Sequence, residues 1–225
     1  MSPGPTPKGQ QRRAALLDAA ERVLTSAGGS ELTLRAVAEE AGVRLGHLQY
    51  YFPARADLLA ALLDRVLTTS LERVTDLTDT ARTANAEPDE ESGLEPGPDP
   101  GPDTGLDTGL DAALDALLDG VLSDHDDPRL VRLFTEVWAL AAHDEEAASA
   151  VRAFYDRYAS HVASYVRDHA PGVSAADARH RAEVFVMLME GSALFRSGIT
   201  GRRSTDADAR LRAVARALLG GEARP

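Results

Sequence analysis

The chain has 225 residues, is 44% apolar and 5% aromatic, contains no cysteine and carries a formal net charge of -12. The lack of cysteine excludes disulfides and thiolate metal sites, and no stretch approaches the ~18 apolar residues of a membrane span. Residues 1–10 lack the apolar core of a signal peptide, so we expect a cytoplasmic protein that makes no contact with a membrane.

Four helices are predicted in the N-terminal third of the chain, because apolar residues recur there at helical spacing. Two glycines end the first helix, and Thr33 can cap the second. Gly42 permits a sharp turn before the third helix, and Pro53 breaks the chain before a long fourth one. The expected ranges are 10–27, 34–41, 44–51 and 54 to the low eighties.

Residues 85–109 are rich in Pro, Gly, Asp and Glu, a composition that buries too little apolar surface to offset chain entropy. We therefore expect a disordered acidic loop. A four-residue period places aspartates at 99, 103, 107, 111, 115 and 119. A calcium-binding repeat is the alternative, but it requires more oxygen ligands and fixed glycine positions than this pattern offers.

The net charge argues against nucleic acid as a partner, because binding to phosphates depends on Lys and Arg. The distribution of charge removes this objection. Residues 1–65 contain eight basic and seven acidic side chains, and nine acids without any base lie between positions 85 and 111. The N-terminal quarter, at +1, can approach DNA.

Five further helices are expected downstream of the acidic loop, from periodic apolar residues and from capping signals such as Asp127-Pro128 and Ser174. The fifth begins near 108, and the others cover 128–141, 145–169, 174–197 and 205–219. The prediction is an all-α fold of about nine helices with no strand.

A helix-turn-helix requires a small residue where its two helices touch, a glycine in the turn and buried anchors on the second helix. Ala38, Gly42, Val43 and Leu48 meet these requirements. The pattern alone also fits any tightly packed helix pair.

The wider segment 33–59 resembles the DNA-binding domain of the tetracycline-repressor (TetR) family. The matching positions are Ala41-Gly42-Val43, Gly46, Leu48, Tyr51-Phe52-Pro53, Arg55 and Asp57-Leu58-Leu59. Two positions depart from the family pattern, since Arg44 replaces a small hydroxyl residue and Gln49 replaces an aromatic one. The resemblance covers residues 10–65 and leaves the operator sequence open.

The resemblance implies that Thr33, Tyr51 and Arg55 bind DNA phosphates. Lys8, Arg12 and Arg13 could add further contacts to the DNA backbone from the N-terminal arm. The residues expected to face the major groove are Arg35, Arg44, Leu45, His47, Gln49 and Tyr50. Their chemistry fits, because arginine binds guanine, glutamine binds adenine and leucine contacts the thymine methyl. The alternative is an ordinary solvated helix face.

The resemblance also implies a division of the chain into a flexible arm over 1–9, a DNA-binding domain over 10–54, and an effector and dimerisation domain over 55–225. We expect a homodimer, which would present two recognition helices to successive turns of the major groove. The expected interface residues are Leu188, Gly191, Ser192, Phe195, Leu211, Val214 and Leu218.

Most aromatic side chains of the C-terminal domain fall within four predicted helices and could line a cavity for an apolar or amphipathic effector. The candidates are Phe134, Trp138, Phe154, Tyr155, Tyr158, Tyr165, Phe185 and Met189, with His143, His161 and Glu190 as polar anchors. Plain core packing is the alternative explanation for each of them.

The sequence indicates no metal site, cofactor or enzymatic activity. The histidines lack zinc-ligand spacing, and Ser192 has no second glycine to form a nucleophile elbow. The leading hypothesis is a ligand-responsive repressor that effector binding releases from DNA. A helical interaction module without DNA binding and a helical enzyme are the competing hypotheses, and neither accounts for Arg35, Arg44 and Gln49 together.

Overall fold

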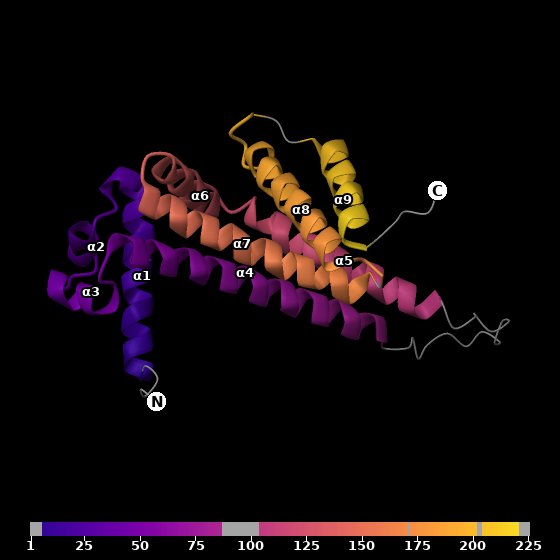
Figure 1. Cartoon of the computed structure of the whole chain (residues 1–225), viewed down its shortest axis with the longest axis horizontal. Helices are drawn as coiled ribbons and strands as arrows, with labels where there is room; N and C mark the ends of the chain where they lie inside the picture. Colours follow the sequence, from indigo (N-terminus) through magenta and orange to yellow (C-terminus); the bar gives the residue numbers. More distant parts are fainter. Residues whose placement is uncertain (1–5, 87–103, 171, 202–203, 221–225) are drawn as a thin grey trace. The chain divides into compact units, whose positions relative to one another are not determined.

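The computed structural model describes residues 6–86, 104–170, 172–201 and 204–220. These residues form nine α-helices and one short 3-10 helix, and no strand occurs among them, which confirms the all-α prediction (Figure 1). The elements are α1 (Pro7–Ala27), η1 (Gly29–Glu31), α2 (Leu34–Glu40), α3 (Leu45–Tyr51), α4 (Arg55–Ala86), α5 (Thr104–Asp124), α6 (Pro128–Ala141), α7 (Glu145–His169), α8 (Ala175–Arg196) and α9 (Thr205–Gly220).

Helices α1 and α5 begin earlier than predicted. Thr6 caps α1 by accepting a hydrogen bond from the Gly9 N–H at 3.3 Å, and Pro7 occupies the first helical position. Residues 7–9 of the expected flexible arm are therefore helical. Helix α5 begins at Thr104, because the four-residue leucine period from Leu106 onward already has helical spacing. Of the predicted loop 85–109, residues 87–103 lie outside the described part of the chain.

The chain divides into two compact units, and each is described by itself. The first comprises residues 1–67 and 127–158, and the second comprises residues 68–126 and 159–225. Helices α4 and α7 are each divided between the two units. The predicted helix-turn-helix lies entirely in the first unit, together with α6.

The first unit has an apolar core between α1, α4 and α6, and its fully buried side chains include Leu16, Leu24, Leu58, Leu62 and Leu133. Helix α6 lies close to the end of α1. A Cβ atom on Gly29 would lie 3.0 Å from the Glu136 carbonyl oxygen, so any larger residue would push the two segments apart by a few tenths of an ångström. The Gly29 N–H donates to Glu136 Oε2 at 2.8 Å.

One carboxylate links three helices of the first unit. Glu21 of α1, only 12% exposed, accepts a hydrogen bond from Arg65 of α4 at 2.9 Å and another from Arg129 of α6. Because a largely buried carboxylate is costly to leave unpaired, Glu21 helps to hold these three helices together.

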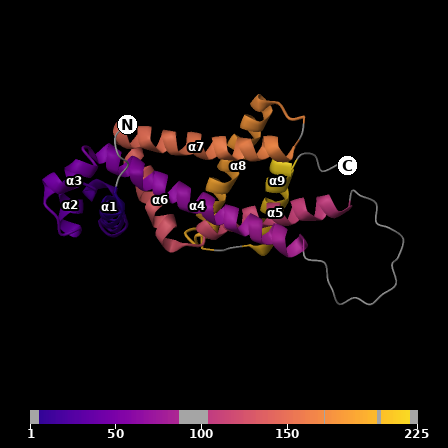
Figure 2. The ribbon, with the colours of Figure 1, turned by 90° about the horizontal axis from the view of Figure 1, so that it is seen from below.

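In the second unit, α8 and α9 lie side by side (Figure 2). Phe185, Met189 and Leu118 are fully buried in its core. Arg196, whose side chain is 4% exposed, forms ion pairs with Asp126 at 2.9 Å and with Asp208 of α9 at 2.6 Å. These bonds hold the C-terminal end of α8 against α9 and the residues that follow α5.

Candidate nucleic-acid interface

Helices α2 and α3 meet through a tight turn at Gly42. This residue has φ +63°, a conformation that L side chains rarely adopt. The Val43 N–H donates to the Ala38 carbonyl at 2.9 Å, and Ala38 is 3% exposed at the helix contact. The small residue and the glycine thus have the structural roles that the sequence pattern predicted.

Helix α3 has one buried side and one exposed side. Leu48 and the following Phe52 are 0% and 1% exposed, so they anchor the helix on the core of the first unit. On the other side Arg44, His47 and Gln49 are exposed, and Tyr50 is 80% exposed. A large aromatic side chain so open to solvent is unusual in a packed domain.

Tyr51 is half-buried, and its ring contacts two other rings of α3. Its ring lies edge-to-face against Tyr50, with centroids 5.2 Å apart, and against His47 at 5.5 Å. These contacts restrict the rotamers of all three rings. Leu45 is half-exposed at the start of the same helix.

The caps of α2 and α3 differ. Thr33 caps α2, with its Oγ1 accepting a hydrogen bond from the Ala36 N–H at 3.1 Å, and Arg35 is exposed in the first turn. Arg44 occupies the corresponding position of α3, and its side chain makes no capping bond. A side-chain cap contributes about 1 kcal/mol, so Arg44 lacks this stabilisation and leaves its guanidinium exposed.

Arg55, predicted to bind phosphate, forms an ion pair with Asp144 in this structure. Asp144 directly precedes α7 and accepts a second hydrogen bond from the Ala147 N–H at 2.8 Å. That bond and the Arg55 guanidinium hold the pKa of Asp144 below its ordinary value. The pair was not predicted, because 89 residues separate its members.

The three basic residues that were expected to contact the DNA backbone from the N-terminal arm all lie in α1. Lys8 and Arg12 are exposed. The guanidinium of Arg13 lies over the Phe52 ring, 5.2 Å from its centroid, in a cation–π contact. Arg13 therefore packs beside the C-terminal end of α3.

Two family models match the chain. Residues 16–62 match the model described as bacterial regulatory proteins, tetR family, and residues 110–224 match the model of the BetI-type transcriptional repressor, C-terminal. The chain belongs to the TetR family. It is thereby placed among DNA-binding transcriptional regulators, and the resemblance in the helix-turn-helix segment is confirmed.

Curated relatives within this family match over the N-terminal part. The repressor KstR of Mycolicibacterium smegmatis is 37% identical over 79 residues, which are 35% of this chain and 37% of KstR. The regulator TtgR of Pseudomonas putida is 42% identical over 55 residues, 24% of this chain and 26% of TtgR. The chain thus spans about a third or less of the length of these relatives.

Solved structures of TetR-family and other transcriptional regulators share the fold over almost the whole chain. A putative TetR-family regulator from Rhodococcus sp. has a TM-score of 0.66 at 20% identity, covering 93% of this chain and 99% of that one. A putative transcriptional regulator from Pseudomonas aeruginosa PAO1 has a TM-score of 0.65 at 20% identity, covering 94% and 90%. These likenesses extend the TetR-family fold beyond the helix-turn-helix.

The aromatic residues predicted to line an effector cavity divide between the two units. In the first unit, the Phe154 ring lies 5.5 Å from that of Phe134 and 6.3 Å from that of Tyr158. Trp138 is 37% exposed and donates through Nε1 to the Tyr155 hydroxyl at 2.9 Å. These rings pack on one another, as the core-packing alternative expects, and His143 is exposed.

In the second unit, Phe185 and Met189 are fully buried and Glu190 is half-buried. Tyr165 stacks on His169, with ring centroids 4.0 Å apart. Of the predicted cavity residues, His161 is exposed and borders a hollow of about 390 Å³.

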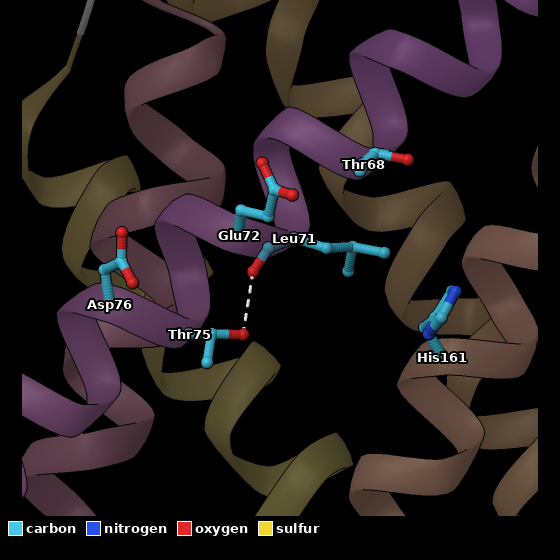
Figure 3. A pocket seen from close by; sticks show the side chains of 6 residues that line it. All are labelled: Thr68, Leu71, Glu72, Thr75, Asp76 and His161. Atoms are coloured by element: carbon cyan, nitrogen blue, oxygen red, sulfur yellow. Dashed lines mark hydrogen bonds between the residues drawn. The ribbon is translucent and has the colours of Figure 1, made fainter. Parts of the chain in front are cut away.

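We call this hollow the α4–α7 hollow. Five of its residues follow one another along α4, and His161 of α7 lies across from them (Figure 3). The lining residues are Thr68, Leu71, Glu72, Thr75, Asp76 and His161. The five residues on α4 were not predicted, because four of them are polar and have the sequence pattern of a solvated helix face.

The residues predicted for the dimer interface lie on α8 and α9. Phe195 is 61% exposed and Val214 is 51% exposed, Gly191 is exposed, and Leu188, Ser192, Leu211 and Leu218 are half-exposed. Val184, Met187 and Leu194 extend the exposed apolar surface of α8, at 48%, 68% and 47%. Val184 and Met187 were not predicted, although the helical spacing of Val184 with Leu188 and of Met187 with Leu194 is a signal that identifies them.

His125 lies beside the predicted interface residue Ser192. Its Nδ1 is 3.3 Å from Ser192 Oγ. Burial, reinforced by the positive charge of Arg196, lowers the pKa of His125 to about 4, although Asp126 acts in the opposite direction. The neutral imidazole is therefore the form that the folded protein favours.

This depressed pKa predicts a loss of stability in acid. Between the unfolded value of 6.5 and the folded value of about 4, the unfolded chain binds more protons at His125 than the folded chain does. The contribution of His125 to the free energy of unfolding is therefore fully present above pH 6.5, and it decreases as the pH falls toward 4. We expect the free energy of unfolding to fall by about 2 kcal/mol between pH 7.5 and pH 4.5 from this histidine.

Urea unfolding of the native protein and of His125→Gln at a series of pH values measures this contribution. The difference between their unfolding free energies should change by that amount over the interval. Parallel pH dependences for the two proteins would show that His125 is not the responsible group.

Proposed function

We propose that the protein is a ligand-responsive repressor that binds a palindromic operator as a homodimer and is released by a small-molecule effector. The observation that carries this proposal is the exposed face of α3, where Arg44, His47, Gln49 and Tyr50 are open to solvent while Leu48 anchors the helix in the core. A basic and polar face on a helix anchored by Leu48 suits insertion into the major groove.

The residues have distinct proposed roles. Thr33, Tyr51 and Arg55 bind phosphates and fix the register of the protein on the duplex. Arg35, Arg44 and Gln49 read base edges, Leu45 contacts a thymine methyl, and His47 and Tyr50 complete the reading surface. The DNA-binding domain is assigned to residues 10–54, to which Arg55 adds a contact from the start of α4, and effector binding and dimerisation are assigned to residues 55–225. The proposed place of action is the cytoplasm.

The effector is proposed to be an apolar or amphipathic small molecule. The α4–α7 hollow supports the amphipathic class, because Leu71 provides an apolar wall while Glu72 and Asp76 provide hydrogen-bond acceptors. Effector binding would favour a conformation with weaker operator affinity.

The proposed function is tested on the DNA that adjoins the gene of this protein. An inverted repeat there, with half-site centres about one helical turn apart or at multiples of that distance, is assayed by gel shift at moderate salt against a scrambled duplex. Preference for the repeat supports the repressor function. Equal binding to both duplexes contradicts sequence-specific regulation, and an absence of salt-dependent binding favours the interaction module.

Homodimerisation predicts a specific effect of charge on α8. Phe195→Glu should convert the dimer to a monomer, because it places a carboxylate within the exposed apolar surface of α8, where burial without a partner is unfavourable. Sedimentation velocity measures the result at micromolar concentration. The matched control is Ala176→Glu, which adds the same charge at an exposed position in the first turn of α8. A Phe195→Glu protein that sediments like this control would exclude the interface.

A further inference from the structure

The ion pair between Arg55 and Asp144 lies within the first unit and joins the start of α4 to the start of α7. The two side chains are 29% and 24% exposed, so the pair is partly shielded from water. Asp144 is held in place independently of Arg55, since its Oδ1 accepts the Ala147 N–H at 2.8 Å. The carboxylate is therefore the fixed partner, and the long arginine side chain is the adaptable one.

Arg55 also lies close in sequence to the exposed face of α3 that is proposed to read DNA. It lies four residues after Tyr51, the last residue of α3, and it is the first residue of α4. The proposed function assigns it to a phosphate of the operator. A guanidinium can pair in bidentate fashion with a carboxylate or with a phosphate, and both anions require the same planar arrangement of N–H groups.

The surroundings of Asp144 disfavour a bridge in which Arg55 binds both anions at once. Such a bridge would bring a phosphate close to the carboxylate, and like charges at short range repel. Two more acids, Glu145 and Glu146, follow Asp144 in the first turn of α7. Glu145 pairs with Arg152 at 2.5 Å, while its own side chain is 83% exposed.

We propose that Asp144 competes with the operator phosphate for Arg55, so that the ion pair of the free protein opens when DNA binds. This inference rests on the proposed function, because it takes the phosphate contact of Arg55 from there. The ion pair then lowers the affinity for DNA, because it must break before Arg55 binds a phosphate. Its strength depends on where the α6–α7 connection holds Asp144 relative to α4.

The test compares Asp144→Asn with Glu145→Gln. Asparagine retains the side-chain oxygen that caps α7 and removes the charge, whereas Glu145→Gln removes the same charge one residue away. The probe is a 20-base-pair duplex of arbitrary sequence, since a phosphate contact does not depend on sequence. Asp144→Asn should bind about 3–10-fold more tightly than Glu145→Gln, because one charge-assisted bond no longer has to break.

The same comparison in an Arg55→Gln background identifies the mechanism. There the advantage of Asp144→Asn over Glu145→Gln should disappear, because the residue for which Asp144 competes is missing. An advantage that persists without Arg55 would overturn the proposal in favour of general charge repulsion. Weaker binding by Asp144→Asn than by Glu145→Gln would also overturn it, since Asp144 would then be positioning Arg55 for DNA.

Asp144→Ser provides a second uncharged variant, because serine also caps helices, and circular dichroism verifies the fold of each variant. Serine should reproduce the gain seen with asparagine. A failure of every variant, the native protein included, to bind duplex DNA would contradict the proposed function itself. Normal binding by the native protein without a gain in Asp144→Asn or Asp144→Ser would contradict the competition alone.

Discussion

Replacing both Arg44 and Gln49 by alanine is expected to remove most of the preference of this regulator for its operator. The two side chains are exposed on α3, and each can form a bidentate contact with a base. Each such contact contributes about 1–3 kcal/mol of discrimination against the wrong base. Because both side chains are exposed and that of Arg44 makes no capping bond, we expect the double variant to remain folded.

Fluorescence anisotropy with the operator and with a scrambled duplex measures this discrimination. The specific affinity should fall much further than the non-specific affinity, which depends on phosphate contacts. Arg22→Ala is the matched control, because Arg22 is an exposed arginine of the same unit that pairs with Glu40 on α2. An equal loss for operator and scrambled duplex in the double variant would refute the base-reading role of both residues.

Arg196→Met is expected to lower the free energy of unfolding by about 1.5–3 kcal/mol, the contribution of a hydrogen bond to a charged group, because the guanidinium is buried while the carboxylates left behind are 41% and 20% exposed. Methionine replaces the apolar stem of the arginine but leaves Asp126 and Asp208 without their guanidinium. The Leu122 carbonyl, 3.4 Å from Arg196 Nη2, also loses a donor. Thermal unfolding should show a decrease of several degrees for each kcal/mol lost.

Arg212→Met is the control for Arg196→Met. Arg212 of α9 pairs with Asp119 of α5 at 2.6 Å, but the side chains are 33% and 60% exposed. An exposed pair contributes about 0–1 kcal/mol, so this variant should remain close to the native stability. Similar losses in the two variants would show that burial does not distinguish the two pairs.

The helices and the helix-turn-helix were predictable from sequence because their signals are local. Gly42, Leu48 and Pro53 lie within a dozen residues of one another, and each acts on the backbone or the core at its own position. The start of α1 was missed by three residues, although Thr6-Pro7 is itself a capping signal. Acidic and glycine-rich composition obscured the start of α5.

The pairings between distant side chains were not predictable in the same way. Asp144 lies 89 residues from Arg55, and Asp126 lies 70 residues from Arg196. Charged residues are abundant in this chain, so no local pattern indicates which acid meets which base. The polar residues of the α4–α7 hollow, such as Glu72 and Asp76, likewise have the sequence appearance of a solvated helix face.

The sharing of Glu21 between Arg65 and Arg129 has a mechanical consequence. With the Gly29 contact to Glu136, it ties the C-terminal part of α1 to α4 and α6, so these helices cannot slide past one another without breaking charged bonds. The exposed face of α3 belongs to the same compact unit, so we expect it to move together with these helices. An effector that changes operator affinity is then expected to reorient this unit as a whole. The exposed residues of α3 would keep their arrangement, and only their orientation toward the DNA would change.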